Sequence, residues 1–489
     1  MKPLQTVLLG SLLAAPLWGV ECGAAVALAK GTITSAQTVA AGAFNPGGKS
    51  ADQFKPLPEF CRISAVLKPV TDSEIKIEVW LPVSNWNGSL QSVGNGAWAG
   101  TISDPAMATA LAAGYATAST DTGHAGNNAD FITGHPEKVV DFAYRAVHEM
   151  TVAAKAIAQS YYGSPLKHSY WNGCSTGGRQ AFAEVQRYPA DYDGVIAGAP
   201  ANYVTRLQGM QVWAAAEAHK DEAAYIPPEK YALLHDLALK TCDALDGVKD
   251  GVIENPERCK VDPTPLLCKA ADAPTCLTGP QLAFAKKMYS GPERLFPGVE
   301  PGSELGWSTL AGPRPMALAV EVYKFIILED PKWDYRTFDA TKDIARAQKM
   351  AATLDSTDPN LKPFFGRGGK LLIYHGWADP GVPPRNTVNY YKSVVETVGG
   401  AAKSMDSMRL FMVPGMGHCR GGEGPDTFDA VGILRDWVEQ HKAPDQMIAS
   451  RVRNGSPNRT RPLCPYPQES VYKGSGSTDD AANFSCKAK

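Results

Sequence analysis

One short stretch of the chain has the residue types and spacing of an exposed catalytic serine. Residues 173–178 read Gly-Cys-Ser-Thr-Gly-Gly, which fits the pattern G-x-S-x-G around Ser175. In this pattern a sharp turn between a strand and a helix exposes the serine hydroxyl. The flanks agree, because 169–172 has the composition of a short buried strand and 179–187 carries apolar residues at helical spacing. An ordinary glycine-rich turn is the alternative, so the prediction depends on the rest of the chain.

Two later residues have the character of the partners that a nucleophilic serine requires. Acyl transfer by serine needs a histidine that takes the hydroxyl proton and a carboxylate that holds the histidine in the right tautomer. In hydrolases with this serine turn the order is Ser, Asp or Glu, then His, each after a strand. Asp379 directly follows the strand-like run 370–376, and His418 lies in a glycine-rich turn after the run 408–413. We therefore predict a triad of Ser175, Asp379 and His418.

The serine also requires N–H groups that stabilise the negative oxygen of a tetrahedral intermediate. One donor is expected from the backbone of Thr176, the residue after the nucleophile, and the other from a loop after an early strand. Residues 94–97, Gly-Asn-Gly-Ala, follow a strand-like run at 90–93 and fit this position. An ordinary turn is the alternative at 94–97.

A separate stretch has the residue types of a cation-binding loop. Residues 242–252 place three aspartates close together, with glycines that allow the chain to turn between them. Carboxylate and carbonyl oxygens are the ligands that calcium prefers. The predicted ligands are the side chains of Asp243, Asp246 and Asp250 and the carbonyl oxygens of Val248 and Val252. The spacing is not that of an EF-hand, and a pair of Asp-Gly turns is the alternative. We recognise no zinc or redox-metal motif.

The composition is that of an ordinary globular protein. The 489 residues are 44% hydrophobic and 20% charged, with a formal net charge of -2. This charge gives no indication of nucleic acid as a partner, and no run of about 20 apolar residues follows the N-terminus, so we expect no membrane span. Residues 1–21 have a basic start, an apolar centre and small residues beyond, which is typical of a secretory signal. We expect a secreted or periplasmic protein, and a monomer or weak homo-oligomer; a buried N-terminal helix is the alternative for the signal.

Ten cysteines in an exported chain indicate disulfides. Their separations suggest the pairs Cys22–Cys61, Cys242–Cys259, Cys268–Cys276 and Cys464–Cys486, leaving Cys174 and Cys419. The sequence alone does not fix the connectivity. A bridge between the last two would hold the serine turn beside the histidine loop. The alternative, that Cys174 is itself the nucleophile, is disfavoured by its place one residue from the apex of the turn and by an oxidising compartment.

Strand-like and helical segments alternate along much of the chain. The predicted strands include 75–81, 90–93, 115–120, 169–172, 195–198, 370–376 and 408–413. Long amphipathic helices are predicted at 142–162 and 427–440. This alternation favours an α/β fold with a sheet that is parallel in its central part.

The composition and the predicted secondary structure of the chain change between residues 202 and 366. Cysteines, prolines and short helical stretches dominate there, and strand-like runs are scarce. We predict that this helical insertion, 202–366, interrupts a core formed by 22–201 and 367–489. The tail beyond residue 443 is predicted to be rich in loops.

Together these motifs resemble the tannase/feruloyl esterase family, which includes type-B feruloyl esterases, tannases and mono(hydroxyethyl) terephthalate hydrolase. The resemblance rests on the Cys-Ser pair at 174–175, the His-Cys pair at 418–419, and the segments 192–195, 198–201 and 461–467. It covers nearly the whole chain after the signal. It implies an α/β-hydrolase core with a mostly parallel central sheet and an inserted lid domain, which is the helical insertion.

The resemblance also implies roles for individual residues. Ser175 corresponds to the nucleophile, Asp379 to the acid and His418 to the base. The oxyanion amides fall on Thr176 and Ala97, although many members have glycine at position 97. A structural calcium ion in the lid, no organic cofactor, and a Cys174–Cys419 bridge beside the four other pairs are implied as well.

We therefore expect a secreted serine esterase whose substrate is a small aromatic ester. Hydroxycinnamate (feruloyl) esters are the first choice, and galloyl esters or a terephthalate monoester are the alternatives. Four aromatic residues of the helical insertion are candidates for the pocket wall, although for each a place in the core of the lid is the favoured interpretation: Trp213, Trp307, Tyr323 and Phe325. A non-catalytic binding protein and a secreted serine peptidase are further alternatives. The complete triad argues against the first, and a comparison of aryl esters with peptides would separate the second.

Overall fold

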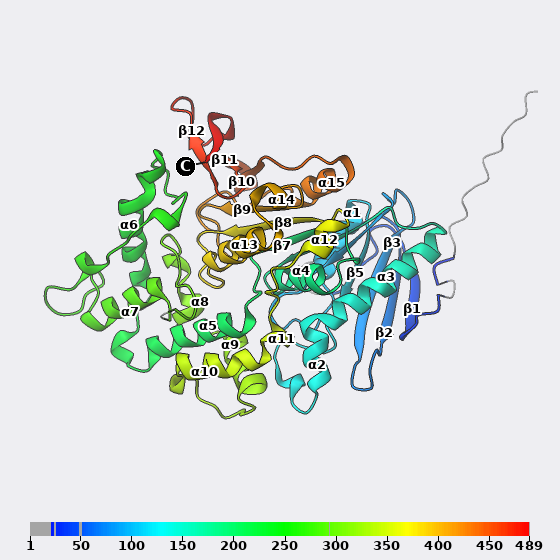
Figure 1. Ribbon diagram of the computed structural model, residues 1–489, viewed down its shortest axis with the longest axis horizontal. Coiled ribbons are helices and arrows are strands. Elements are labelled where there is room, and N and C mark those ends of the chain that lie inside the picture. Colours follow the sequence, from blue (N-terminus) through cyan, green and yellow to red (C-terminus); the bar gives the residue numbers. More distant parts are fainter. Residues whose placement is uncertain (1–20, 24–25, 48–50, 293, 489) are drawn as a thin grey trace, which may run out of the picture.

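The computed structural model describes residues 21–23, 26–47, 51–292 and 294–488. Apart from Glu21, the expected signal segment lies outside these residues. The centre of the molecule is a nine-stranded sheet with helices on both faces, and the helical insertion lies beside it (Figure 1). The layered α/β organisation predicted from the sequence is therefore present.

The sheet is antiparallel at one edge and parallel over the rest. In space its strands follow the order β1-β2-β3-β5-β4-β6-β7-β8-β9. The first three pair antiparallel with their neighbours, whereas β5, β4 and the strands beyond them are parallel. The strands are β1 (Gly31–Val39), β2 (Phe60–Leu67), β3 (Ile75–Pro82), β4 (Ser89–Val93), β5 (Ala116–Thr120), β6 (His168–Cys174), β7 (Gly194–Gly198), β8 (Lys370–Gly376) and β9 (Met408–Val413).

Helices cover both faces of the parallel part, so its strands are buried on both sides. Every residue of β7 and β9 is buried, which explains their nearly continuous apolar sequences. The core helices are α1 (Asp104–Ala112), α2 (Pro136–Val140), α3 (Ala146–Tyr162), α4 (Thr176–Arg187), α13 (Arg385–Val398), α14 (Ala401–Ser404) and α15 (Ala430–Gln440). Side chains of α3, α4 and α13 share one apolar cluster, while those of α15 belong to a cluster on the opposite face.

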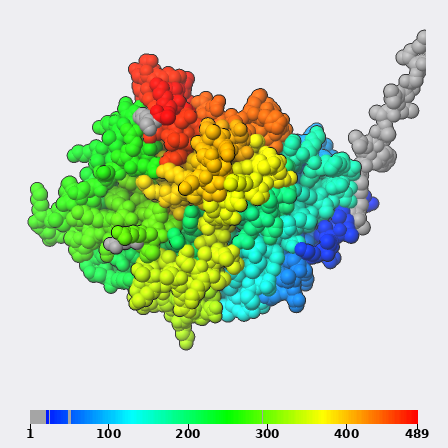
Figure 2. Space-filling view, in the orientation of Figure 1, coloured from blue at the N-terminus to red at the C-terminus, as the bar shows by residue number. Residues whose placement is uncertain are grey.

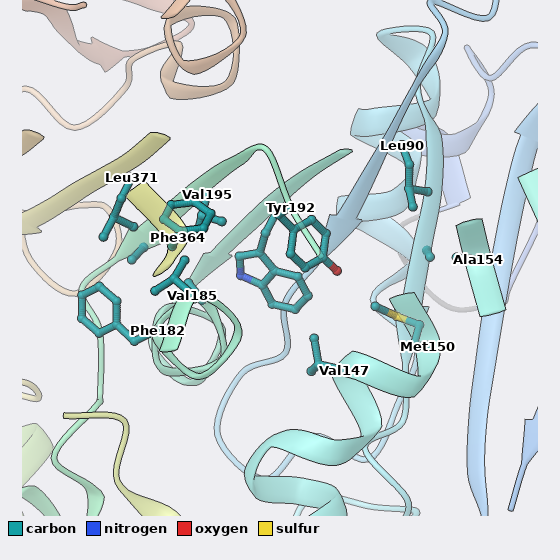
Figure 3. Packing of buried hydrophobic residues seen from close by; sticks show 14 of the residues in the cluster. Leu90, Val147, Met150, Ala154, Phe182, Val185, Tyr192, Val195, Phe364 and Leu371 are labelled. Atoms are coloured by element: carbon teal, nitrogen blue, oxygen red, sulfur yellow. The ribbon is translucent and has the colours of Figure 1, made fainter. Parts of the chain in front are cut away.

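The α4 helix is the best-buried helix of the core. Figure 3 shows Phe182 and Val185 of α4 on one side of the cluster and Val147 and Met150 of α3 on the other side, with Tyr192 between the two groups. All of α4 from Thr176 to Val185 is buried. Such packing leaves little room for the helix to move, and it therefore fixes the position of the residue at the N-terminus of α4.

The helical insertion contains no strand among its described residues. Its helices are α5 (Val204–His219), α6 (Tyr231–Cys242), α7 (Gly279–Ser290), α8 (Ser308–Ala311), α9 (Ala317–Glu321), α10 (Ala340–Ala347), α11 (Ala351–Leu354) and α12 (Lys362–Gly366). Most of them pack in an apolar cluster that also includes core residues such as Trp98 and Phe142, and the insertion makes up the green to yellow-green lobe of the surface (Figure 2). None of the described helices combines the length and the apolar character needed to cross a membrane.

Three parts of the fold differ from the sequence predictions. Strands β1 and β2 were not expected, and β1 is mostly exposed, so its sequence lacks a strong apolar pattern. Residues 141–145 form a π-helix ahead of α3. The tail is not mainly loop: it forms two hairpins, whose strands are β10 (Met447–Arg453), β11 (Ser456–Leu463), β12 (Gln468–Tyr472) and β13 (Phe484–Ala488).

Candidate active site

Ser175 lies at the sharp turn between β6 and α4. Its backbone has φ 64° and ψ -119°, a conformation that a residue with a side chain rarely adopts. The turn is tight because the chain folds back on itself: a Cβ on Gly173 would lie 2.5 Å from the carbonyl oxygen of Gly177. Glycine is therefore required at 173, and the serine is held at the N-terminus of a rigid helix.

The structure brings the three predicted triad residues together at the carboxyl ends of the parallel strands. Nε2 of His418 lies 2.8 Å from Oγ of Ser175. Nδ1 of the same imidazole lies 2.6 Å from Oδ2 of Asp379. Asp379 follows β8 and His418 follows β9, and β8 and β9 are neighbours in the sheet. This chain of hydrogen bonds can move a proton from the serine hydroxyl to an imidazole that a carboxylate stabilises.

The electrostatics of the site suit this proton transfer. Asp379 has no exposed surface, and burial alone would raise the pKa of its carboxyl, but His418 and His375 outweigh burial and hold the pKa below its usual value. Burial lowers the pKa of His418, and the Asp379 carboxylate outweighs this effect, so the imidazole pKa lies above 6.5. The carboxylate is therefore charged and the imidazole is a stronger base than in water.

A residue that the sequence predictions did not include supports Asp379. Nε2 of His375 lies 3.1 Å from Oδ2 of Asp379, and Nδ1 of His375 lies 2.8 Å from Oγ1 of Thr387. The other carboxylate oxygen, Oδ1, accepts a hydrogen bond from the backbone of Val382 at 3.0 Å. These bonds fix the plane of the Asp379 carboxylate independently of its bond to His418. The indication that the sequence offered of this role is the position of His375, four residues before Asp379.

The serine turn and the histidine loop are joined covalently. Cys174 and Cys419 form a disulfide across 245 residues of chain, as the family resemblance implies. The two cysteines directly adjoin Ser175 and His418, so the bridge limits how far the hydroxyl and the imidazole can separate. The other disulfides are Cys22–Cys61, Cys242–Cys259, Cys268–Cys276 and Cys464–Cys486. All ten cysteines are paired, and none is free.

The loop expected to supply an oxyanion amide lies against the first turn of α4. A Cβ on Gly94 would lie 2.6 Å from Cα of Gly177, so the approach requires glycine. Oγ1 of Thr176 donates a hydrogen bond to the carbonyl oxygen of Ala97 at 3.1 Å, and Ala97 has a positive φ of 47°. Thr176 and Ala97 are therefore adjacent beside Ser175. This adjacency is what a pair of backbone donors from these two segments would require.

Asn95 keeps this loop in place and was not singled out from the sequence. Its Nδ2 donates to the carbonyl oxygen of Thr120 at 2.8 Å, and its backbone N–H donates to Oε1 of Gln180 at 3.1 Å. Asn95 is buried, so these bonds replace those it would make with water. The loop is thereby tied to both β5 and α4.

A cavity of about 380 Å³ lies beside the triad, between the core and the helical insertion. This volume falls in the range of pockets that hold small organic molecules. Its aromatic walls are Trp98 and Phe142, which come from the core. The aromatic candidates from the insertion, Trp213, Trp307, Tyr323 and Phe325, do not line the cavity; Trp307 and Tyr323 are fully buried in the apolar cluster that holds most of the insertion helices. Their place in the interior of the lid, which the sequence favoured over contact with the ligand, is therefore confirmed for Trp307 and Tyr323.

The polar groups of the cavity are mostly neutral. Gln208 and Gln211 of α5 each have a buried carbonyl oxygen without a hydrogen-bond partner among the described residues, and the Nε1 of Trp98 is also unpartnered. Nε2 of Gln211 donates to the carbonyl oxygen of Gly381 at 2.6 Å. These side chains are held in place around an apolar space and can still form hydrogen bonds.

One guanidinium lies in the cavity wall. Arg179 of α4 is 2% exposed, and burial lowers its pKa to about 10. Its two Nη atoms donate to the backbone oxygens of Ala143 and Phe142, at 2.5 and 3.0 Å. Because both Nη atoms of Arg179 form hydrogen bonds with the π-helix at 141–145, the guanidinium holds this segment against α4. No lysine lines the cavity.

The predicted cation loop lies next to the Cys242–Cys259 disulfide, and its three aspartate side chains are not among the groups of closely spaced ligand atoms found in the described part of the chain. Asp243 accepts hydrogen bonds from the backbone of Asp250 and Gly251, each at 3.1 Å. Oδ2 of Asp250 is paired with Arg461, and burial, which outweighs this arginine, raises the pKa of Asp250. The oxygen-only donor set fits a hard divalent cation. Asp250 also accepts a hydrogen bond from the backbone of Val252, so a cation there would compete with this amide and with Arg461.

Three comparisons with known proteins agree. A family model described as "Tannase and feruloyl esterase" matches residues 61–315 and 319–487. A protein named as an uncharacterised esterase of Xanthomonas campestris pv. campestris is 36% identical over 98% of this chain and 93% of its own. The probable feruloyl esterase B-2 of Aspergillus terreus is 33% identical over 90% of this chain and 89% of its own.

The likeness extends to a solved structure. Feruloyl esterase B from Aspergillus oryzae superposes with a TM-score of 0.88 at 32% identity, covering 94% of this chain and 98% of that one. This superposition confirms the α/β-hydrolase architecture predicted for the sheet and its helices. The chain therefore belongs to the tannase and feruloyl esterase family, whose members are carboxylic ester hydrolases.

Proposed function

We propose that this protein is a secreted serine esterase that hydrolyses esters of phenolic aromatic acids through Ser175, His418 and Asp379. The observation that carries the proposal is the unbroken series of hydrogen bonds from Oγ of Ser175 through His418 to Asp379. The adjoining cavity has room for a single aromatic acyl group. Secretion is supported by the five disulfides, because such bonds persist in oxidising compartments.

The reaction follows from the geometry of the triad. His418 takes the proton of Ser175 as Oγ attacks the ester carbonyl, and the N–H groups of Thr176 and Ala97 receive the negative oxygen. The imidazolium then gives its proton to the alcohol, which leaves an acyl group on Ser175. Water, activated by His418, attacks this acyl-enzyme and releases the acid. Asp379 stays ionised throughout and stabilises the imidazolium.

The acyl group is proposed to carry phenolic hydroxyls, as in hydroxycinnamate esters. Trp98 and Phe142 offer apolar faces to an aromatic ring. The amides of Gln208 and Gln211 can form hydrogen bonds with ring hydroxyls. A terephthalate monoester carries a carboxylate, which needs a free cation nearby, and the one guanidinium of the cavity wall is engaged with backbone carbonyls. Galloyl esters remain the second candidate.

The helical insertion is proposed to serve as the lid of this site and to hold a calcium ion. Asp243, Asp246 and Asp250, with the carbonyl oxygens of Val248 and Val252, would bind the ion. Calcium there would neutralise clustered carboxylates and brace a loop far from any reacting atom, so its contribution is to stability.

The variant Ser175→Ala tests the proposed nucleophile. Hydrolysis of methyl ferulate should fall by about 10⁶, as expected when a triad serine is removed, with an unchanged circular dichroism spectrum. The matched control is Ser92→Ala, which removes a buried hydroxyl of β4 that lies beside Tyr192 and does not line the cavity and should leave the rate unchanged. Substantial turnover by the folded Ser175→Ala variant would exclude this serine as the nucleophile.

Side-by-side hydrolysis of three esters tests the proposed substrate class. Methyl ferulate should have the highest kcat/KM, methyl gallate a lower value, and a terephthalate monoester the lowest. A preference for the terephthalate monoester would show that the cavity accommodates a charged acyl group, and the phenolic proposal would then be wrong.

A further inference from the structure

A cluster of side chains that could bind a metal lies away from the cavity and from the predicted cation loop. It consists of His148 on α3, Glu184 on α4 and Asp191 in the loop before β7. One potential ligand atom from each residue lies within 4.8 Å of the others. None of the three lines the cavity beside the triad. The esterase reaction therefore does not account for this grouping.

Glu184 places a carboxyl group in the interior of the protein, where a negative charge needs compensation. It is 1% exposed, and its carboxyl group shares a hydrogen bond with the carboxyl group of Asp191. Two neighbouring carboxyl groups that are largely buried need a proton or a cation between them. A metal ion can bind oxygens of both carboxylates.

The neighbours of Glu184 supply the rest of a ligand set. Nδ1 of His148 lies 2.7 Å from Oδ2 of Asp191, and the imidazole is stacked on the ring of Tyr188 with centroids 3.8 Å apart. The side chains of His148 and Asp191 are 27% and 12% exposed. The cluster is thus rigid on its inner side and reachable from solvent on its outer side.

We propose that His148, Glu184 and Asp191 bind a structural zinc ion that joins α3, α4 and the loop before β7. One imidazole nitrogen with carboxylate oxygens suits zinc, whereas calcium and magnesium prefer oxygen alone. Zinc would bind Nδ1 of His148 in place of the hydrogen that it now shares with Asp191, the neutral imidazole would carry its proton on Nε2, and the proton shared by the Glu184 and Asp191 carboxyl groups would leave to solvent. Water can complete the tetrahedral shell on the exposed side.

The charges around the cluster are compatible with a divalent ion. Two carboxylates would neutralise zinc. Lys155 is the nearby cation, and its ammonium donates to the backbone carbonyl of Asp191 rather than to either carboxylate. Burial lowers the pKa of Lys155. Because the Lys155 ammonium bonds a backbone oxygen, it leaves the carboxylate oxygens of Asp191 and Glu184 available to the metal.

Zinc affinity of the full-length protein tests this site. The protein is kept in excess calcium, and zinc is titrated against a chromophoric zinc indicator. We expect about one equivalent of zinc per chain, bound in the tetrahedral manner of a structural site. The variants His148→Ala and Glu184→Gln should each weaken this binding by at least about tenfold, which corresponds to the loss of about 1.4 kcal/mol.

A matched control separates this site from histidine-rich surfaces in general. His135 forms an exposed pair with Asp72, with Nδ1 and Oδ1 2.8 Å apart, but neither belongs to the three-residue cluster. His135→Ala should leave the zinc affinity unchanged. The proposal is overturned if the native chain binds no zinc, if His135→Ala weakens binding as much as His148→Ala, or if folded Glu184→Gln binds as tightly as the native chain. In the first and last cases Glu184 is held neutral by a proton shared with Asp191.

Discussion

Replacement of Asp379 by asparagine is the sharpest test of the proposed triad, because both histidine bonds end on one oxygen. His418 and His375 each lie against Oδ2, at 2.6 and 3.1 Å, while the Val382 amide donates to Oδ1 at 3.0 Å. In Asp379→Asn, an NH₂ group that faces the histidines cannot accept their protons. If the amide flips, its NH₂ faces the Val382 N–H instead. Either orientation breaks part of the arrangement without changing side-chain volume.

The rate loss can be bounded from these contacts. A hydrogen bond to a charged group contributes about 1.5–3 kcal/mol, so loss of the Asp379 to His418 bond alone lowers kcat by about ten to more than a hundredfold. The asparagine NH₂ also favours the His418 tautomer that carries its proton on Nε2, and this tautomer cannot accept the proton of Ser175. The combined loss in such triads is about 10⁴ in kcat. We expect a loss of this size.

The pH dependence gives a second, independent readout. His418 must be neutral to act as base, so activity rises with pH through its pKa, which in the native enzyme lies above 6.5 because Asp379 outweighs burial. Asparagine removes the opposing charge and leaves the burial. The acid limb of kcat/KM for methyl ferulate should therefore move to lower pH.

The control for this experiment is Asp355→Asn. Asp355 is also buried and accepts bonds from Thr205, but it does not line the cavity. It should keep the native acid limb and most of the rate. A folded Asp379→Asn enzyme with less than about tenfold loss, or with an unmoved acid limb, would refute the role given to Asp379.

Three further changes probe the neighbouring features. His375→Ala removes one donor to Asp379 and should lower kcat by about ten to a hundredfold with methyl ferulate; an unchanged kcat would mean that Val382 and His418 suffice to orient the carboxylate. Calcium chelation should lower the Tm, by the equivalent of about 2.7 kcal/mol for an ion held at a hundredfold excess over Kd, and an unchanged Tm in calorimetry would argue against the site. Joint replacement of Cys174 and Cys419 by alanine opens a 245-residue loop, which costs up to about 5 kcal/mol in denaturant unfolding; kcat should fall even where circular dichroism shows an intact fold, and parallel loss of both would contradict a local role for the bridge.

The strands that precede the three predicted triad residues could be recognised from local patterns. Ser175, Asp379 and His418 follow β6, β8 and β9; β8 and β9 are largely buried and rich in apolar residues, whereas β6 is recognised mainly by the serine motif at its end. Because the carboxyl ends of parallel strands meet at one edge of a sheet, the order of the motifs indicated their meeting point. What the sequence could not give is the distance between them, which depends on the pairing of β6, β7, β8 and β9.

Features that depend on long-range packing were missed. Strand β1 is mostly exposed and β11 contains two prolines, so neither has the alternating apolar pattern of a strand. Trp98 and Phe142 reach the cavity because their segments converge beside α4, and no local pattern reports that convergence. The proposed zinc ligands were missed for the same reason. His148 and Asp191 are 43 residues apart in the sequence, and Nδ1 of His148 lies 2.7 Å from Oδ2 of Asp191 only in the folded chain.

The distribution of these residues over the chain explains how such a site can change its substrate while keeping its chemistry. Every triad residue and both oxyanion candidates lie on the core, on loops tied to the sheet by backbone pairing and by the Cys174–Cys419 bridge. The cavity walls are shared between the core and α5 of the helical insertion. Gln208 and Gln211 lie on α5 and not in the sheet, so substitutions at these positions can alter the pocket without changing the strands that hold the triad. Specificity should therefore respond to changes in α5 with little effect on the reactivity of Ser175 toward a small, unspecific ester.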